Sequence, residues 1–71
     1  MNRLTEVDGM RLRRLRKENA LTMRELSERS GVSLDTILKL EHGNREARPG
    51  TLRKLAGALS VEPKELMKGE E

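Results

Sequence analysis

The chain has 71 residues and no cysteine, phenylalanine, tyrosine or tryptophan, which predicts one domain (residues 1–71) with an aliphatic core and no thiolate metal site. The net charge is +3, but residues 62–71 hold four of the 12 acidic and two of the 15 basic residues, so residues 1–61 carry +5. This excess suits a polyanionic partner, although a solvated surface explains it equally well. No apolar run approaches the about 20 residues that cross a bilayer, and charges interrupt any signal peptide, so we expect a cytoplasmic protein without a membrane partner.

Apolar residues recur at helical spacing along the chain, and no segment alternates as a strand does, so we predict an all-α, compact five-helix bundle. The first helix is predicted over about residues 6–19. Thr5 and Asp8 resemble a capping box, in which each side chain accepts a hydrogen bond from the other residue's backbone. Gly9 weakens the first turn, so a start near this residue is the alternative. Leu12 lies on the apolar face.

Two shorter helices, over about residues 23–30 and 34–42, are predicted to be joined by a tight turn at Gly31. Thr22 and Glu25 form a capping box at the start of the first of them, and Gly31 suits the left-handed conformation that ends many helices. In the second helix, Ser33 is expected to be the cap and Gly43 the end. The residues expected on its inward side are Val32, Ile37 and Leu40. The residues expected to face outward are Leu34, Asp35, Leu38, Lys39 and His42.

The remainder of the chain is predicted to hold a polar loop over residues 44–50 and two further helices. One spans about 52–60 and is capped by Thr51, and the other is a short helix over about 63–68 that begins at Pro63. The residues of these helices expected to pack on the bundle are Leu52, Leu55, Ala56, Leu59, Leu66 and Met67. The segments expected to fray are residues 1–5 and 69–71.

In their order and spacing, these residues resemble the helix-turn-helix domains of the Cro and phage-repressor (XRE) type over about residues 9–67. The pieces that carry the resemblance are Leu12-x-x-Leu15-Arg16, Leu21-Thr22, Glu25-Leu26, Gly31-Val32-Ser33, Ile37, Leu40-Glu41-x-Gly43 and Leu55-Ala56-x-x-Leu59. The resemblance implies a lambda-repressor-like DNA-binding domain whose helix-turn-helix unit spans about residues 22–43. It also implies a sequence-specific DNA-binding regulator of transcription, in the first place a repressor, that reads the major groove with helix 34–42.

The resemblance also implies roles for individual residues. Those at or beside positions that face bases are Ser33, Leu34, Asp35, Leu38 and Lys39. Those at the start of the preceding helix, whose backbone N–H groups can meet a phosphate, are Thr22, Met23 and Arg24. Those that follow the recognition helix along the phosphate backbone are His42, Asn44 and Arg45. The residues expected to form a largely buried ion pair between two helices are Arg16 and Glu41.

The outward face departs from the family's pattern. Met23 replaces a glutamine that commonly bonds a phosphate, and with Leu34 and Leu38 it is predicted to form an exposed apolar patch. Such a patch packs either on thymine methyl groups or on a protein, and the second possibility defines an alternative function, an antitoxin-like or adaptor module on the same fold. Asp35 either accepts a hydrogen bond from cytosine N4 or pairs with Lys39 four residues later.

The expected partner is double-stranded DNA with a palindromic operator, bound by a homodimer, because one domain this small covers only about 600–1,000 Å² of DNA. We expect the dimer contact in helix 52–60, helix 63–68 and the C-terminal tail, and a nucleoid-associated location in the cytoplasm. His42 is the single histidine, with no carboxylate or thiol cluster nearby. We therefore expect no enzyme activity, no metal, no cofactor and no small-molecule ligand.

Overall fold

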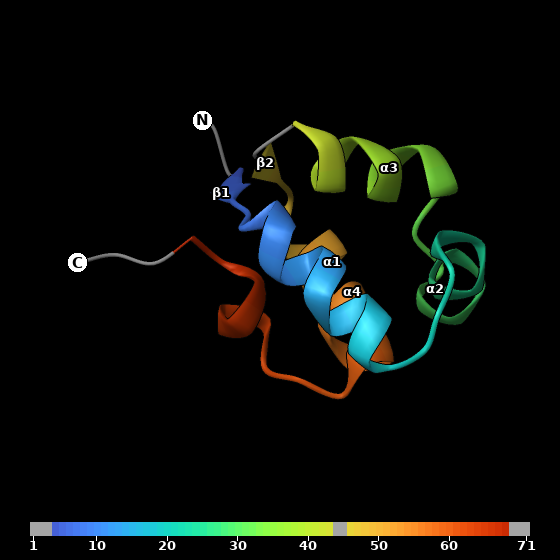
Figure 1. Cartoon of the computed structure of the whole chain (residues 1–71). Coiled ribbons are helices and arrows are strands. Elements are labelled where there is room, and N and C mark those ends of the chain that lie inside the picture. The colour runs from blue at the N-terminus through green and yellow to red at the C-terminus, as the bar shows by residue number, and fades with distance from the viewer. Residues whose placement is uncertain (1–3, 44–45, 69–71) are drawn as a thin grey trace.

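The computed structural model describes residues 4–43 and 46–68, and Figure 1 shows how its elements are arranged. In chain order the elements are β1 (Thr5–Glu6), α1 (Gly9–Glu18), α2 (Met23–Ser30), α3 (Leu34–His42), β2 (Glu46–Ala47), α4 (Pro49–Leu59) and the 3-10 helix η1 (Pro63–Leu66). Helix α3 lies along the top of the view, α1 runs across the middle, and η1 lies at the lower left. The helices surround one core.

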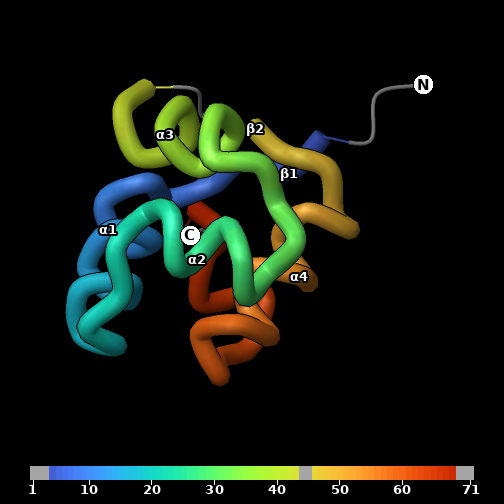
Figure 2. Tube along the Cα trace, turned by 90° about the vertical axis from the view of Figure 1, so that its right-hand side faces the viewer, coloured from blue at the N-terminus to red at the C-terminus, as the bar shows by residue number. Residues whose placement is uncertain are grey.

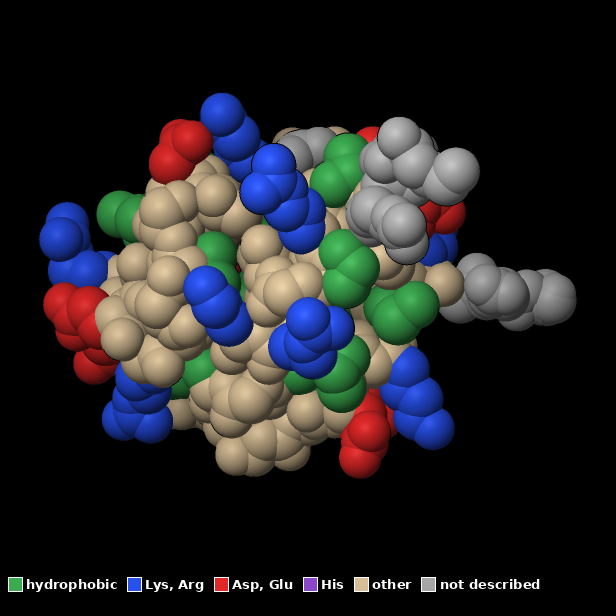
Figure 3. Space-filling view, turned by 180° about the vertical axis from the view of Figure 1, so that it is seen from behind, with side chains coloured by type: hydrophobic (Ala, Val, Ile, Leu, Met, Phe, Trp, Pro, Cys, Tyr) green, Lys and Arg blue, Asp and Glu red, His purple; other side chains and the backbone are tan. Residues whose placement is uncertain are grey.

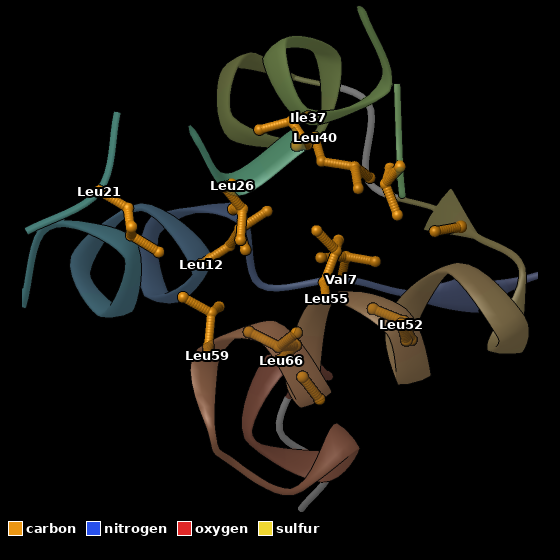
Figure 4. Packing of buried hydrophobic residues seen from close by; sticks show 13 residues of the cluster. Val7, Leu12, Leu21, Leu26, Ile37, Leu40, Leu52, Leu55, Leu59 and Leu66 are labelled. Carbon is orange, nitrogen blue, oxygen red and sulfur yellow. The ribbon is translucent and has the colours of Figure 1, made fainter. Parts of the chain in front are cut away.

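The interior is built from aliphatic side chains that every helical element contributes (Figure 4). The largest fully buried side chains are Leu12, Leu26, Ile37, Leu55, Leu59 and Leu66. The inward stripes predicted for α3 and α4 are confirmed, since Ile37 and Leu40 of α3 and Leu52, Leu55, Ala56 and Leu59 of α4 are all buried. Burying one such leucine contributes about 1.5–3 kcal/mol, so this core dominates the stability of the fold.

The predicted boundaries of α2 and the start of α3 are confirmed by their hydrogen bonds. The Glu25 N–H donates to the Thr22 hydroxyl at 3.0 Å, and the Thr22 N–H donates to the Glu25 carboxylate at 2.9 Å. The bond from the Thr22 N–H lowers the pKa of Glu25 below its ordinary value. Helix α2 ends at Ser30 and is capped by Gly31, whose φ of +77° lies in the left-handed region that glycine adopts readily. Ser33 caps α3 by accepting from the Thr36 N–H at 3.1 Å.

The first helix begins later than residue 6, and the expected Thr5–Asp8 capping box is wrong. Helix α1 starts at Gly9, the alternative that its weak first turn suggested, and Asp8 is the cap residue. The Asp8 carboxylate accepts from the Arg11 N–H at 3.1 Å. A Cβ atom at Gly9 would overlap the backbone carbonyl oxygen of Leu40, so α1 and α3 approach each other here more closely than any other residue would permit.

Two short strands, absent from the prediction, hold the N-terminal segment in place. Strand β1 pairs antiparallel with β2, with Thr5 opposite Ala47, so the prediction that residue 5 frays is wrong. Val7, the residue after β1, forms an antiparallel bridge with Met67 near the C-terminal end. Val7 and Ala47 are both buried and extend the core. Residues 1–3 and 69–71, also expected to fray, lie outside the described residues.

The C-terminal part departs from the prediction in two ways. Helix α4 begins at Pro49, three residues earlier than predicted, so Thr51 lies inside its first turn and Arg48 occupies the cap position. Proline suits this first helical position because its missing N–H would have no partner there. The predicted fifth helix is the single 3-10 turn η1, so the described residues form four α-helices and not five. Leu66 is buried as predicted, whereas Met67 is 40% exposed and does not pack into the core.

Candidate nucleic-acid interface

Helices α2 and α3 form a compact pair on one side of the molecule. In Figure 2, α3 lies directly above α2, and the turn between them is at the surface. Two serines at the end of α2 hold this turn: the Ser27 hydroxyl donates to the Val32 carbonyl at 2.6 Å, and the Val32 N–H donates to the Ser30 hydroxyl at 3.1 Å. These two bonds tie α2 to Val32 in the turn that leads into α3. The sequence does not predict this role directly. The one signal that could have indicated it is the position of Ser30 next to Gly31.

Helix α3 has one buried side and one exposed side, as its sequence predicts. Ile37 and Leu40 are buried, together with Val32 of the preceding turn. On the opposite side, Leu34 is 37% exposed and Leu38 is 45% exposed. Asp35, Lys39 and His42 are exposed on the same helix. The whole length of α3 therefore presents side chains to solvent while its other side anchors it to the core.

The polar groups near the start of α3 bond to each other. The Lys39 ammonium lies 3.1 Å from the Asp35 carboxylate, which is the intrahelical alternative considered for Asp35. Both side chains are well exposed, so the pair contributes only about 0.2–0.5 kcal/mol and can be exchanged for other partners. The Ser33 hydroxyl, besides capping the helix, donates to the Thr36 hydroxyl at 2.8 Å.

The start of α2 combines exposed and buried residues. Thr22 and Arg24 are exposed, but Met23 is partly buried and packs against the core. The predicted three-residue apolar patch is therefore wrong, and the exposed apolar pair on this side is Leu34 and Leu38. Helix geometry leaves the N–H groups of Met23 and Arg24 without an intrahelical partner, at the end of the helix that carries partial positive charge.

Arg16 and Glu41 form a buried ion pair that ties α1 to α3. The Arg16 Nε and Nη2 atoms donate to the two Glu41 carboxylate oxygens at 2.7 and 3.0 Å, and Nη1 donates to the Leu21 carbonyl at 2.8 Å. The side chains are 9% and 0% exposed. The hydrogen bond to Glu41 raises the pKa of Arg16 above its ordinary value. The pair sets the position of α3 relative to α1 and to the segment that leads into α2.

His42 lies in the last turn of α3 and lines a shallow hollow with Leu38, Lys39 and Gly43. A basic side chain here is favourable, because the last turn of a helix carries partial negative charge. Asn44 and Arg45, which were predicted to continue along the phosphate backbone, lie outside the described residues. The structure thus places the predicted site residues of α2 and α3 on two adjacent helices. The predicted site residues 44 and 45 are not among those that it describes.

Basic charge alone does not mark one face of this protein. Figure 3, seen from the side opposite to Figure 1, shows lysine and arginine side chains spread over that face as well. On α1, Arg13, Arg14 and Lys17 are exposed along a groove that Met10 and Glu41 also line. The candidate interface is therefore defined by the shape and exposure of α2 and α3 more than by charge density.

Other kinds of site find no support in the described residues. Within residues 4–43 and 46–68, no three histidine or acidic side chains come together as a metal site would require. In the same part of the chain, no helix has the length and apolar character needed to cross a membrane.

Sequence comparison identifies a family and several relatives of this chain. Residues 9–71 match the family model described as Helix-turn-helix domain. The chain is 43% identical over 60 residues to the HTH-type transcriptional regulator RghRB and to the HTH-type transcriptional repressor RghR, both of Bacillus subtilis (strain 168). The aligned part covers 83% of this chain but only 43% and 44% of those two proteins, so the chain spans less than half of their length.

Two solved structures have the same fold. The restriction-modification controller protein C.AhdI from Aeromonas hydrophila matches with a TM-score of 0.77 and 37% identity, over 83% of this chain and 89% of that chain. A hydroxyethylphosphonate dioxygenase matches with a TM-score of 0.80 and 26% identity, over 93% of this chain but 14% of the dioxygenase. That likeness is confined to a small part of the enzyme. The chain belongs to the helix-turn-helix domain family, of the Cro and phage-repressor (XRE) type.

Proposed function

We propose that this protein is a sequence-specific DNA-binding regulator of transcription, and more narrowly a repressor, that inserts α3 into the major groove. The observation that carries the proposal is the two-sided α3, buried along one side and open to solvent along the other. A recognition helix needs this arrangement, because the groove admits one helix and the scaffold must hold it from behind. RghR, which is named a transcriptional repressor, supports the narrower form.

Within this proposal, the residues divide into two groups. The side chains that face base edges are Ser33, Leu34, Asp35, Leu38 and Lys39. The groups that meet the phosphate backbone are Thr22, Met23 and Arg24 at the start of α2 together with His42, Asn44 and Arg45 at and after the end of α3. The exposure of Arg24 and the N–H groups at the start of α2 support the phosphate group, because a helix N-terminus attracts an anion.

A homodimer on a palindromic operator completes the proposal, since one domain covers little DNA. Leu66 is fully buried, so it cannot supply the dimer contact that its position near the C-terminus suggested. Met67 remains available, and it lies beside β1 through its bridge to Val7. We therefore place the dimer contact at Met67 and the exposed side of α4. Such a regulator works in the cytoplasm, on the nucleoid.

Selection from a pool of random duplexes tests the function directly. The chain is expected to enrich a palindrome whose half-sites lie about one helical turn, 34–36 Å, apart. The recovered sequence then serves as the probe for sedimentation, where a complex of two chains per duplex is expected. A pool that stays random after repeated selection would refute DNA recognition, and a complex of one chain per duplex would refute the dimer.

Salt dependence tests the phosphate contacts with a matched pair of variants. Each phosphate contact contributes about 0.9 to the slope of log affinity against log salt concentration. Arg24→Ala removes one contact from each of the two chains on the duplex, so it is expected to reduce the slope by about two. Arg29→Ala removes the same charge near the other end of α2 and should leave the slope unchanged. A slope for Arg24→Ala equal to that of the wild type would show that Arg24 does not contact the phosphate backbone.

The alternative, an antitoxin-like or adaptor module, draws on the exposure of Leu34 and Leu38. Apolar binding to a protein depends weakly on salt, whereas DNA binding through several phosphates weakens steeply between 50 and 200 mM. Because Met23 is partly buried against the core, the apolar surface left to this alternative is smaller than its sequence predicts.

A further inference from the structure

The middle of the outward face of α3 is apolar, and the polar side chains beside it cap the helix or pair with each other. Ser33 caps the helix, and Lys39 and Asp35 pair across one turn at 3.1 Å. Leu34 and Leu38, which are 37% and 45% exposed, lie one turn apart on the same side of the helix. The side chains with the largest apolar surface on this face are therefore two leucines at i and i+4.

The major groove offers one prominent apolar group to such side chains. Base edges present hydrogen-bond donors and acceptors, and the exception is the C5-methyl group of thymine. We propose that Leu34 and Leu38 recognise thymine methyl groups and thereby select A·T pairs at two positions of each half-site. This inference rests on the proposed DNA-binding function and deepens it, because it names the base chemistry that the reading face accepts.

The spacing of the two leucines sets the spacing of the two bases. Four residues of α-helix rise about 6 Å, and successive base pairs are about 3.4 Å apart along each strand. A helix parallel to the DNA axis would bring Leu34 and Leu38 to base pairs about two steps apart. In zinc fingers, whose helix follows the groove, residues three or four apart contact successive bases, so the two leucines should reach base pairs one or two steps apart. The inference predicts two methyl-bearing pairs at this separation in each half-site.

The surroundings of the leucines favour DNA over a protein partner. A stable protein interface buries about 800 Å² on each side and involves about 20–30 residues, far more than two leucines present. Met23, which would enlarge the patch, packs against the core. Leu38 also shares a shallow hollow with Lys39 and His42, so the apolar surface is bordered by groups that suit a polyanion.

Deoxyuridine provides the test, because it differs from thymidine only by the missing C5-methyl group. The probe is the palindromic duplex recovered by selection, with each thymidine replaced in turn. Burial of one methyl group is worth a factor of about four in affinity, so the wild-type chain should lose about four-fold at each of two positions per half-site. Leu34→Ala should abolish the loss at one position, and Leu38→Ala at the other.

Controls separate this inference from the function on which it rests. Met10→Ala removes an exposed apolar side chain of α1, outside α3 and the proposed dimer contact, and should retain both losses. Circular dichroism checks that every variant is folded. If selection succeeds but wild-type protein binds both duplexes equally, the thymine inference fails and the DNA-binding function stands. Deoxyuridine losses that persist in both alanine variants would also overturn it. A pool without enrichment refutes the function and this inference together.

Discussion

Replacing Arg16 with methionine should destabilise the domain more than any single change on the exposed side of α3. The substitution leaves the fully buried Glu41 carboxylate without its partner and removes the donor 2.8 Å from the Leu21 carbonyl. Breaking a buried ion pair from one side costs about 3–5 kcal/mol. A domain of this length has a total stability of about 4–11 kcal/mol, so Arg16→Met should be marginally folded.

The double variant Arg16→Met/Glu41→Leu separates the cost of a lone charge from the cost of lost packing. Glu41→Leu alone strands the guanidinium and should cost about 3–5 kcal/mol. Removing both charges is often neutral or stabilising by about 1–4 kcal/mol, and the Leu21 carbonyl, now without its donor, costs about 1–3 kcal/mol. The double variant should therefore be close to wild type and more stable than either single variant.

Thermal and urea unfolding, followed by far-ultraviolet circular dichroism, measure these differences, since the chain has no Phe, Tyr or Trp to report by fluorescence. For a domain of this size, 1 kcal/mol shifts Tm by about 4–8 °C, so each single variant should melt at least about 12 °C lower. Glu41→Gln, which keeps the shape but not the charge, provides a milder variant that stays folded. If the two single costs simply add in the double variant, the reasoning about a buried lone charge is wrong.

Three further predictions concern the backbone and one helix cap, and urea unfolding measures all of them. Gly9→Ala should destabilise the domain because its Cβ would overlap the Leu40 carbonyl oxygen. Gly57→Ala, with open space around it, should stabilise α4 by about 0.5–1 kcal/mol. A change of stability in the same direction for both variants would contradict this reasoning. Ala20, with φ of +57°, is in the left-handed region, so Ala20→Gly should stabilise by about 0.5–1 kcal/mol, and an unchanged midpoint would argue against strain. The lowered pKa of Glu25 means that its stabilisation is present above its ordinary value of 4.5 and is lost as the pH falls through the lower folded value. In Glu25→Gln, the free energy of unfolding should no longer show this loss at acid pH. Identical stability–pH profiles for the variant and the wild type would contradict the reasoning.

The parts of the fold that sequence predicts are those that local spacing encodes. The buried stripe of α4 repeats every three or four residues, and the capping box of Thr22 and Glu25 is a contact between residues three apart. The parts that it misses depend on contacts distant in sequence. Val7 is held by Met67, so the short strands have no local signature. The start of α1 at Gly9, which the sequence offers only as an alternative, coincides with a close approach to the Leu40 carbonyl oxygen.

The candidate site shows the same division. The outward face of α3 follows from helical spacing, and the structure agrees with it. Met23 differs because it is the first residue of α2, where a side chain reaches the core beside the incoming segment and does not follow the pattern of the helix interior. The roles of Ser27 and Ser30 in holding the turn depend on bonds to the backbone of Val32, and a serine near a helix end does not by itself indicate such a bond. The contacts of individual residues with DNA stay predictions.

The separation of α3 into an anchored side and an open side has an evolutionary consequence. Substitutions at exposed positions such as Leu38 and Lys39 should change stability by about 0.5 kcal/mol, because neither side chain belongs to the buried core. Binding preference and folding are therefore under nearly independent selection. If α3 reads DNA as proposed, duplicated copies of such a gene can change their binding preference one residue at a time without passing through an unfolded intermediate. The same freedom would make this small chain a practical scaffold for engineered specificity.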